Sequence, residues 1–84
     1  MPSSIAPSLE DLDRLMARLR PTLAEILREW EVPEVEAEEL VSEVLIRLSY
    51  RWSRIPDPER WLLAAVEKEA QRRSERTRKE PRDE

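Results

Sequence analysis

The sequence predicts an all-α fold, a small bundle of three main helices. Apolar residues recur every three or four positions along most of the chain, and no stretch alternates apolar and polar residues as a strand would. Prolines and capping residues separate three such stripes. The 84 residues are enough for one small domain, whose core is marginal without a partner.

The first helix is expected to begin after Ser8, a good N-cap, with Glu10 and Asp11 in its first turn. Its stripe consists of Leu9, Leu12, Leu15, Met16, Leu19, Leu23, Ile26, Leu27 and Trp30. Pro21 interrupts this stripe without changing its phase, so the helix is expected to be kinked or split there. Residues 1–7 contain two prolines and two serines and are expected to be disordered.

A second stripe predicts a helix from about Val35 to about Arg54. Its members are Ala37, Leu40, Val41, Val44, Leu45, Leu48, Trp52 and Ile55. Two prolines must then break the helix, and Asp57 is expected to cap a third helix that has Pro58 at its first position.

The third stripe runs from Trp61 and Leu62 to Ala70, after which no apolar residue follows. The helix can continue through Arg73 or further, but without a side that faces a core. We therefore expect a helical domain over residues 8–73 and a charged, frayed tail over residues 74–84.

Composition argues against catalysis and against a bound cofactor. The chain has no His, no Cys and no Gly, which removes the commonest general base, thiol chemistry and a glycine loop for phosphate. Glu36, Glu39 and Glu43 have the spacing of metal ligands on a helix, but no His accompanies them, and a solvated or partner-facing row is the favoured interpretation. We expect a protein that is not an enzyme and binds neither metal nor cofactor.

The N-terminus has no pattern of a signal peptide, and the longest apolar run is the six residues from Trp61 to Val66. We therefore expect a cytoplasmic protein without a membrane span.

The net charge of −4 conceals an asymmetry: residues 31–45 hold six acids and no base, whereas residues 72–82 hold six bases and two acids. The separation indicates one surface for a basic partner and one for an anion, although the basic run can equally be a solvated tail.

The second helix has a second face. Ile46 and Tyr50 lie one turn apart and off the apolar stripe, in line with Glu39 and Glu43. This pattern suits docking onto a basic surface, and it is also compatible with a solvated face that carries one stray apolar residue.

Two segments resemble a known family. The sequence EAEELVSEVLIRL, from Glu36 to Leu48, is similar to the pattern DAEDLVQEVFLRL in region two of bacterial sigma factors, especially the extracytoplasmic-function group. The segment RWSRIPDPERWL, from Arg51 to Leu62, resembles the RWDRIxDPExWL that leads into the family's promoter-reading helix. LRPTLAEIL resembles the first helix of the same region, so the resemblance covers about residues 12–73.

The resemblance implies a sigma-region-two-like helical domain that acts in transcription. Its acidic helix would dock on the clamp helices of the largest subunit of RNA polymerase core, and the following turn and helix would melt and read the −10 element of promoter DNA. The residues predicted to bind polymerase are Glu36, Glu38, Glu39, Ser42, Glu43, Ile46, Arg47 and Tyr50. Those predicted on the DNA side are Arg51, Trp52, Arg54, Arg60, Trp61, Lys68, Arg72 and Arg73. Trp52 and Trp61 also fall on apolar stripes, which favours packing over DNA reading for each.

Three departures from the family pattern bear on mechanism. Ser42 stands where the docking motif has Gln, and the third helix reads WLLAAVEK where the family has roughly WLRRVARN. Glu67 and Glu69 should repel a phosphate backbone. The 84 residues hold no counterpart of region four, which reads the −35 element in the family, so we expect that the protein does not act alone as a complete sigma factor.

Two mechanisms follow. The protein either supplies promoter melting as half of a split sigma factor, or it occupies the polymerase clamp as a modulator with weak DNA binding, which the depleted third helix favours. The further partner to expect is either a separate chain that carries a −35-reading domain, as in a split sigma factor, or an anti-sigma factor. The alternative is a different class of protein, a small interaction module of antitoxin or adaptor type. Its acidic face would bind a basic partner other than polymerase.

Overall fold

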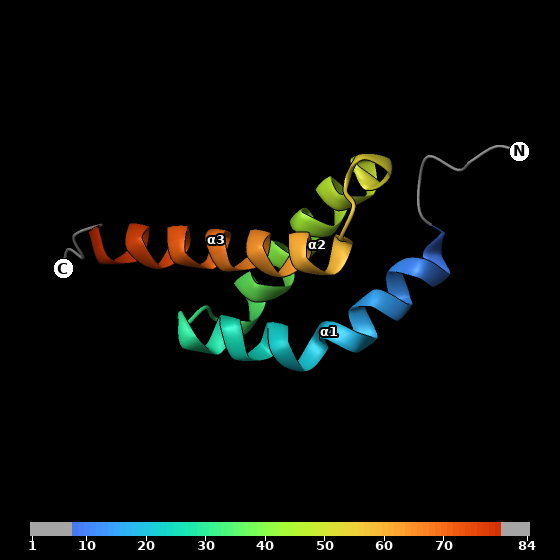
Figure 1. The fold of residues 1–84 in the computed structure, drawn as a ribbon. Helices are drawn as coiled ribbons and strands as arrows, with labels where there is room; N and C mark the ends of the chain where they lie inside the picture. The colour runs from blue at the N-terminus through green and yellow to red at the C-terminus, as the bar shows by residue number, and fades with distance from the viewer. Residues whose placement is uncertain (1–7, 80–84) are drawn as a thin grey trace, which may run out of the picture.

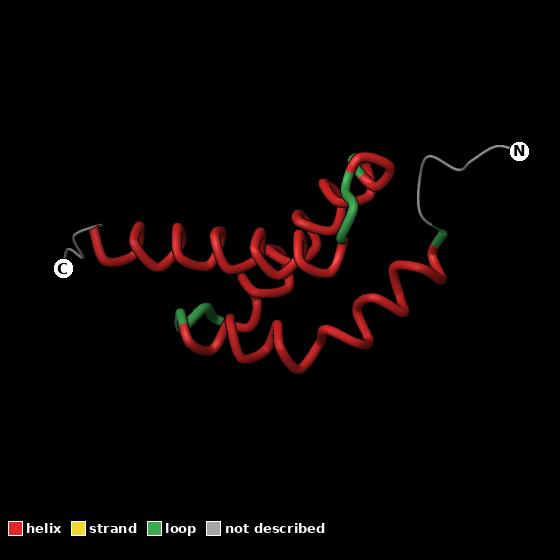
Figure 2. Tube along the Cα trace, in the orientation of Figure 1, coloured by secondary structure: helices red, strands yellow, loops and turns green. Residues whose placement is uncertain are grey.

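The computed structural model describes the backbone of residues 8–79 and the side chains of residues 8–76. Over this range the chain forms helices only, with no β-strand. The elements are α1 (Leu9–Glu29), α2 (Glu34–Tyr50), the short 3₁₀ helix η1 (Trp52–Arg54) and α3 (Pro58–Lys79). Figure 2 shows them joined by short loops. The predicted all-α class with three main helices is therefore confirmed.

The helix α3 packs against both other helices. In Figure 1, α1 and α3 run in the same general direction, and α2 returns obliquely from the end of α1 toward the start of α3. An ion pair between Arg18 Nε and Glu59 Oε2, at 3.2 Å, joins α1 to the first turn of α3. The Arg18 side chain is exposed and that of Glu59 partly exposed, so water screens the pair and it contributes little to the free energy of folding.

The start of α1 is the predicted cap. Ser8 Oγ accepts a hydrogen bond from the backbone N–H of Asp11 at 3.1 Å, and Asp11 Oδ2 accepts one from the N–H of Ser8 at 3.2 Å. This reciprocal capping box satisfies two donors that a helix start leaves unpaired. Pro21 lies inside the helix, which is continuous and bends near its middle (Figure 1). Of the two predicted possibilities, a kinked helix and a helix split at Pro21, the structure has the kinked helix. Leu9, in the first turn and on the predicted apolar stripe, is exposed.

The end of α1 is a Schellman motif. The N–H of Val32 donates to the carbonyl of Leu27 at 2.9 Å. The N–H of Glu31 donates to the carbonyl of Arg28 at 3.0 Å. The motif requires a residue with left-handed backbone, and Glu31 takes that conformation with φ 55°. Glycine usually occupies this position because a Cβ clashes there.

The helix α2 is shorter than predicted. It ends at Tyr50, not near Arg54, and the next residues form η1. The N–H of Arg54 donates to the carbonyl of Arg51 at 2.9 Å, the three-residue spacing of a 3₁₀ turn. The tighter turn lets the chain change direction before Pro56, which an α-helix could not accommodate.

The start of α3 is as predicted, because Asp57 Oδ1 accepts a hydrogen bond from the N–H of Arg60 at 3.2 Å and Pro58 is the first helical residue. The helix continues to Lys79, so the part of the expected tail from Ser74 to Lys79 is helical. The predictions for residues 1–7 and 80–84 lie outside the described residues.

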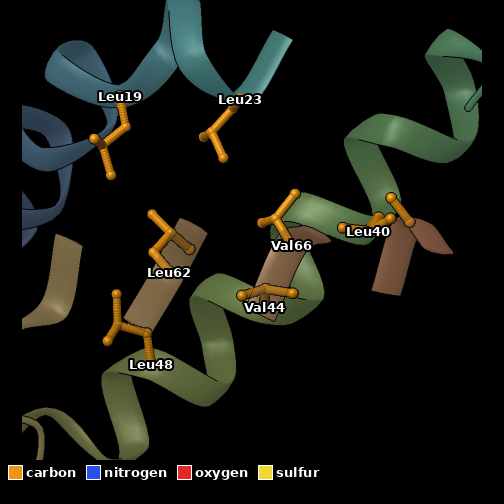
Figure 3. Packing of buried hydrophobic residues seen from close by; sticks show 8 residues of the cluster. Leu19, Leu23, Leu40, Val44, Leu48, Leu62 and Val66 are labelled. Atoms are coloured by element: carbon orange, nitrogen blue, oxygen red, sulfur yellow. The ribbon is translucent and has the colours of Figure 1, made fainter. Parts of the chain in front are cut away.

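Eight apolar side chains form the buried core: Leu19, Leu23, Leu40, Val44, Leu48, Leu62, Val66 and Ala70. Among the described residues no polar or charged side chain is buried. Within each helix the core residues are spaced by four residues, so they stack along one stripe. Figure 3 shows the labelled side chains converging from the three helices. Burying one leucine contributes about 2 kcal/mol, and this set therefore fixes how each helix is rotated about its axis.

Replacing Glu31 with glycine is expected to raise the free energy of unfolding by about 1 kcal/mol, because glycine adopts left-handed backbone without the steric cost of a Cβ. Urea denaturation followed by far-UV circular dichroism measures the change. The matched control is Glu29→Gly in the last turn of α1, expected to lower that free energy by up to about 1 kcal/mol. Equal losses in both variants would contradict a strained turn at Glu31.

Candidate functional site

The side of α2 that faces away from the core is acidic and partly apolar. Leu40, Val44 and Leu48 are fully buried, so the residues half a turn away from them face the solvent. Six of these residues line a shallow hollow of about 500 Å³: Val35, Glu38, Glu39, Ser42, Glu43 and Ile46. Tyr50 follows one turn after Ile46 and is also exposed. We call these seven residues the outer face of α2.

The outer face contains most of the residues predicted to bind polymerase, namely Glu38, Glu39, Ser42, Glu43, Ile46 and Tyr50. The two others, Glu36 and Arg47, lie on the flank of α2 that faces α3, where each pairs with an α3 side chain. The sequence analysis missed Val35. Its spacing of four residues from Glu39 and eleven from Ile46 was the signal that could have placed it on this face.

The acidic flank is partly neutralised from α3. Arg73 reaches the carboxylates of Glu36 and Glu43, at 3.8 Å in each case. The Arg73 side chain is less exposed than either acid. A residue predicted on the DNA side thus lies against the edge of the predicted docking surface.

A second hollow, of about 370 Å³, lies between α2 and α3. It is lined by Arg47, Trp61, Ala64, Ala65, Lys68, Glu69 and Arg72. We call it the α2–α3 groove. It brings three residues of the predicted DNA side, Trp61, Lys68 and Arg72, together with Arg47.

The remaining residues of the predicted DNA side are dispersed. Trp52 packs against the core and borders a hollow on α1 with Leu15 and Arg18, so its position is that of a packing residue. Arg51 and Arg54 are exposed at the turn around η1. Arg60 is exposed in the first turn of α3.

A third hollow, of about 700 Å³, lies between α1 and α2. Apolar side chains form much of its wall, including Met16, Leu27, Val41 and Leu45. Its charged residues are Arg20, Glu34 and Glu38, a mixture that selects neither a cationic nor an anionic ligand.

Within the side chains that the structure describes, no three acids are arranged to hold a metal ion, Glu36, Glu39 and Glu43 included. Among the described helices none is long and apolar enough to cross a membrane.

The chain shows no significant match to any protein-family model, curated protein or solved structure. A proposal for its function therefore rests on the residues and surfaces described above.

Trp52→Ala is expected to lower the free energy of unfolding by about 2 kcal/mol, because the indole is packed between η1 and α1. Tyr50→Ala, two residues away at an exposed position, is expected to change it by less than about 0.5 kcal/mol. Urea denaturation followed by circular dichroism compares the two variants. Equal effects would show that Trp52 is not a packing residue.

Proposed function

We propose that this protein binds RNA polymerase core through the outer face of α2, as its resemblance to sigma-factor region two implies. The observation that carries the proposal is the combination of acids with exposed apolar side chains on one side of a helix whose other side is buried. Val35, Ile46 and Tyr50 are 75 %, 55 % and 82 % exposed, and exposed apolar groups gathered on one side of a helix are typical of an interaction surface.

The chemistry of the outer face suits a basic partner with an apolar centre. Glu38, Glu39 and Glu43 line the same hollow as Ile46. Acids at the rim of an interface accelerate association with a basic surface, whereas buried apolar contacts supply most of the affinity. The clamp helices of the polymerase are the partner that the resemblance implies for this helix.

The charge pairs of α3 favour a modulator with weak DNA binding over autonomous promoter melting. Arg72 and Arg73, both of the predicted DNA side, already pair with carboxylates of this chain. The carboxylates beside these two guanidinium groups offset part of the positive charge that each could offer to a phosphate. In this proposal the protein acts in the cytoplasm, where polymerase works.

The test is retention of the tagged protein by core RNA polymerase. Glu38→Lys/Glu39→Lys reverses two charges of the outer face that make no ion pair within the described residues, and it is expected to weaken retention at least about tenfold. The matched control is Glu67→Lys/Glu75→Lys, which makes the same charge change at exposed positions of α3 and should leave retention unchanged.

Circular dichroism is the check that both double variants keep their helices. Equal retention of both variants would contradict docking through the outer face. If the wild-type protein itself is not retained, the interaction-module interpretation with another basic partner takes the lead.

A further inference from the structure

Among the charged residues of α3 whose side chains the structure describes, Glu69 is the least exposed, at 15 %. Its Oε2 atom lies 3.7 Å from Arg47 Nη2 on α2 and 3.4 Å from Arg72 Nη1 on its own helix. One carboxylate oxygen therefore bridges two guanidinium groups at the wall of the α2–α3 groove.

The groove otherwise has the composition of a nucleic-acid site. Arg47, Lys68 and Arg72 supply three positive charges around a hollow of about 370 Å³. Trp61 lines the same hollow and is only partly buried, so part of its indole is available to a stacked base. Basic side chains next to an aromatic ring suit single-stranded nucleic acid better than a simple anion.

Glu69 competes with a phosphate for the charge of two arginines of the groove, Arg47 and Arg72. Affinity for a polyanion grows with the number of phosphates that Lys and Arg neutralise. An arginine already paired to a carboxylate gains less from a phosphate, because part of its charge is already neutralised.

We propose that Glu69 is an internal counter-ion that suppresses binding of single-stranded nucleic acid in the α2–α3 groove. The carboxylate holds Arg47 and Arg72 together and cancels part of their charge. This proposal deepens the proposed function by giving a reason why DNA binding is weak. It rests on that function only in taking nucleic acid as the polyanion, and it does not require polymerase binding.

The pairs of Arg73 have a similar effect to a smaller degree. Their carboxylates, on Glu36 and Glu43, are 52 % and 57 % exposed, and both distances are 3.8 Å. Water screens such pairs more than it screens Glu69. The largest change is therefore expected at Glu69.

The experiment is fluorescence anisotropy of a labelled oligothymidylate, titrated with the full-length chain over a series of salt concentrations. Glu69→Gln keeps the size of the side chain and removes its charge. At low salt this variant is expected to bind about three- to tenfold more tightly than wild type. Its plot of log affinity against log salt should be steeper by about 0.7 to 1.4, for one or two further phosphates.

The control is Glu67→Gln, an exposed position two residues away that makes no ion pair within the described residues and gives the same change in net charge. It is expected to change affinity less than about twofold, with the slope unchanged. Adding Arg72→Gln to Glu69→Gln should remove most of the gain. If Glu69→Gln loses helicity, Glu69→Met, which also lacks the carboxylate and favours a helix, must show the same gain.

Equal gains for Glu69→Gln and Glu67→Gln would overturn the proposal, because net charge alone would then explain them. Failure of Glu69→Gln to bind more tightly than wild type would also overturn it. A gain for labelled polyglutamate as large as that for oligothymidylate would contradict the assignment to nucleic acid. Since no polymerase is present, these outcomes are independent of whether the proposed docking to polymerase fails.

Discussion

The packing of Leu40, Val44 and Leu48 against the other two helices is the constraint on which both candidate surfaces depend. All three side chains are fully buried, which fixes the rotation of α2 about its axis. The opposite side of the helix must then face the solvent, and it carries the acids together with Ile46 and Tyr50. Burial of one stripe thus determines the chemistry of the exposed one. A different rotation would turn charged residues toward the core, at a cost that no ion pair of the surface could offset.

The same packing brings α3 alongside one flank of α2. At this contact, basic residues of α3 pair with acids of α2, and an acid of α3 pairs with a basic residue of α2. Arg73 reaches Glu36 and Glu43, while Glu69 holds Arg47 and Arg72. These pairs are at the surface or near it, and they contribute less to stability than the core does. Their larger effect is on the distribution of charge. Glu38 and Glu39 of the outer face make no ion pair within the described residues, whereas Arg72 and Arg73 of α3 are both paired with carboxylates. This division fits a protein whose strongest contacts are with a basic partner.

The helices and their core could be predicted because the spacing of apolar residues is a local property of the chain. Capping residues such as Ser8 and Asp57 marked the helix starts for the same reason. The left-handed residue at Glu31 had no signal, since the chain has no glycine to mark it. The ion pairs between α2 and α3 depend on where two helices meet, which spacing within one helix does not give. Arg73 was therefore assigned to the DNA side, although it contacts acids of α2.

The most direct test of the central claim, that the outer face of α2 is the docking surface, is site-specific photo-crosslinking. Benzoylphenylalanine in place of Ile46 should crosslink to the clamp helices of the largest subunit when core RNA polymerase is added and irradiated. The same group in place of Ala64, at an exposed position of the α2–α3 groove, should give no such product. Crosslinks from position 64 but not from position 46, or none from either, would contradict the account.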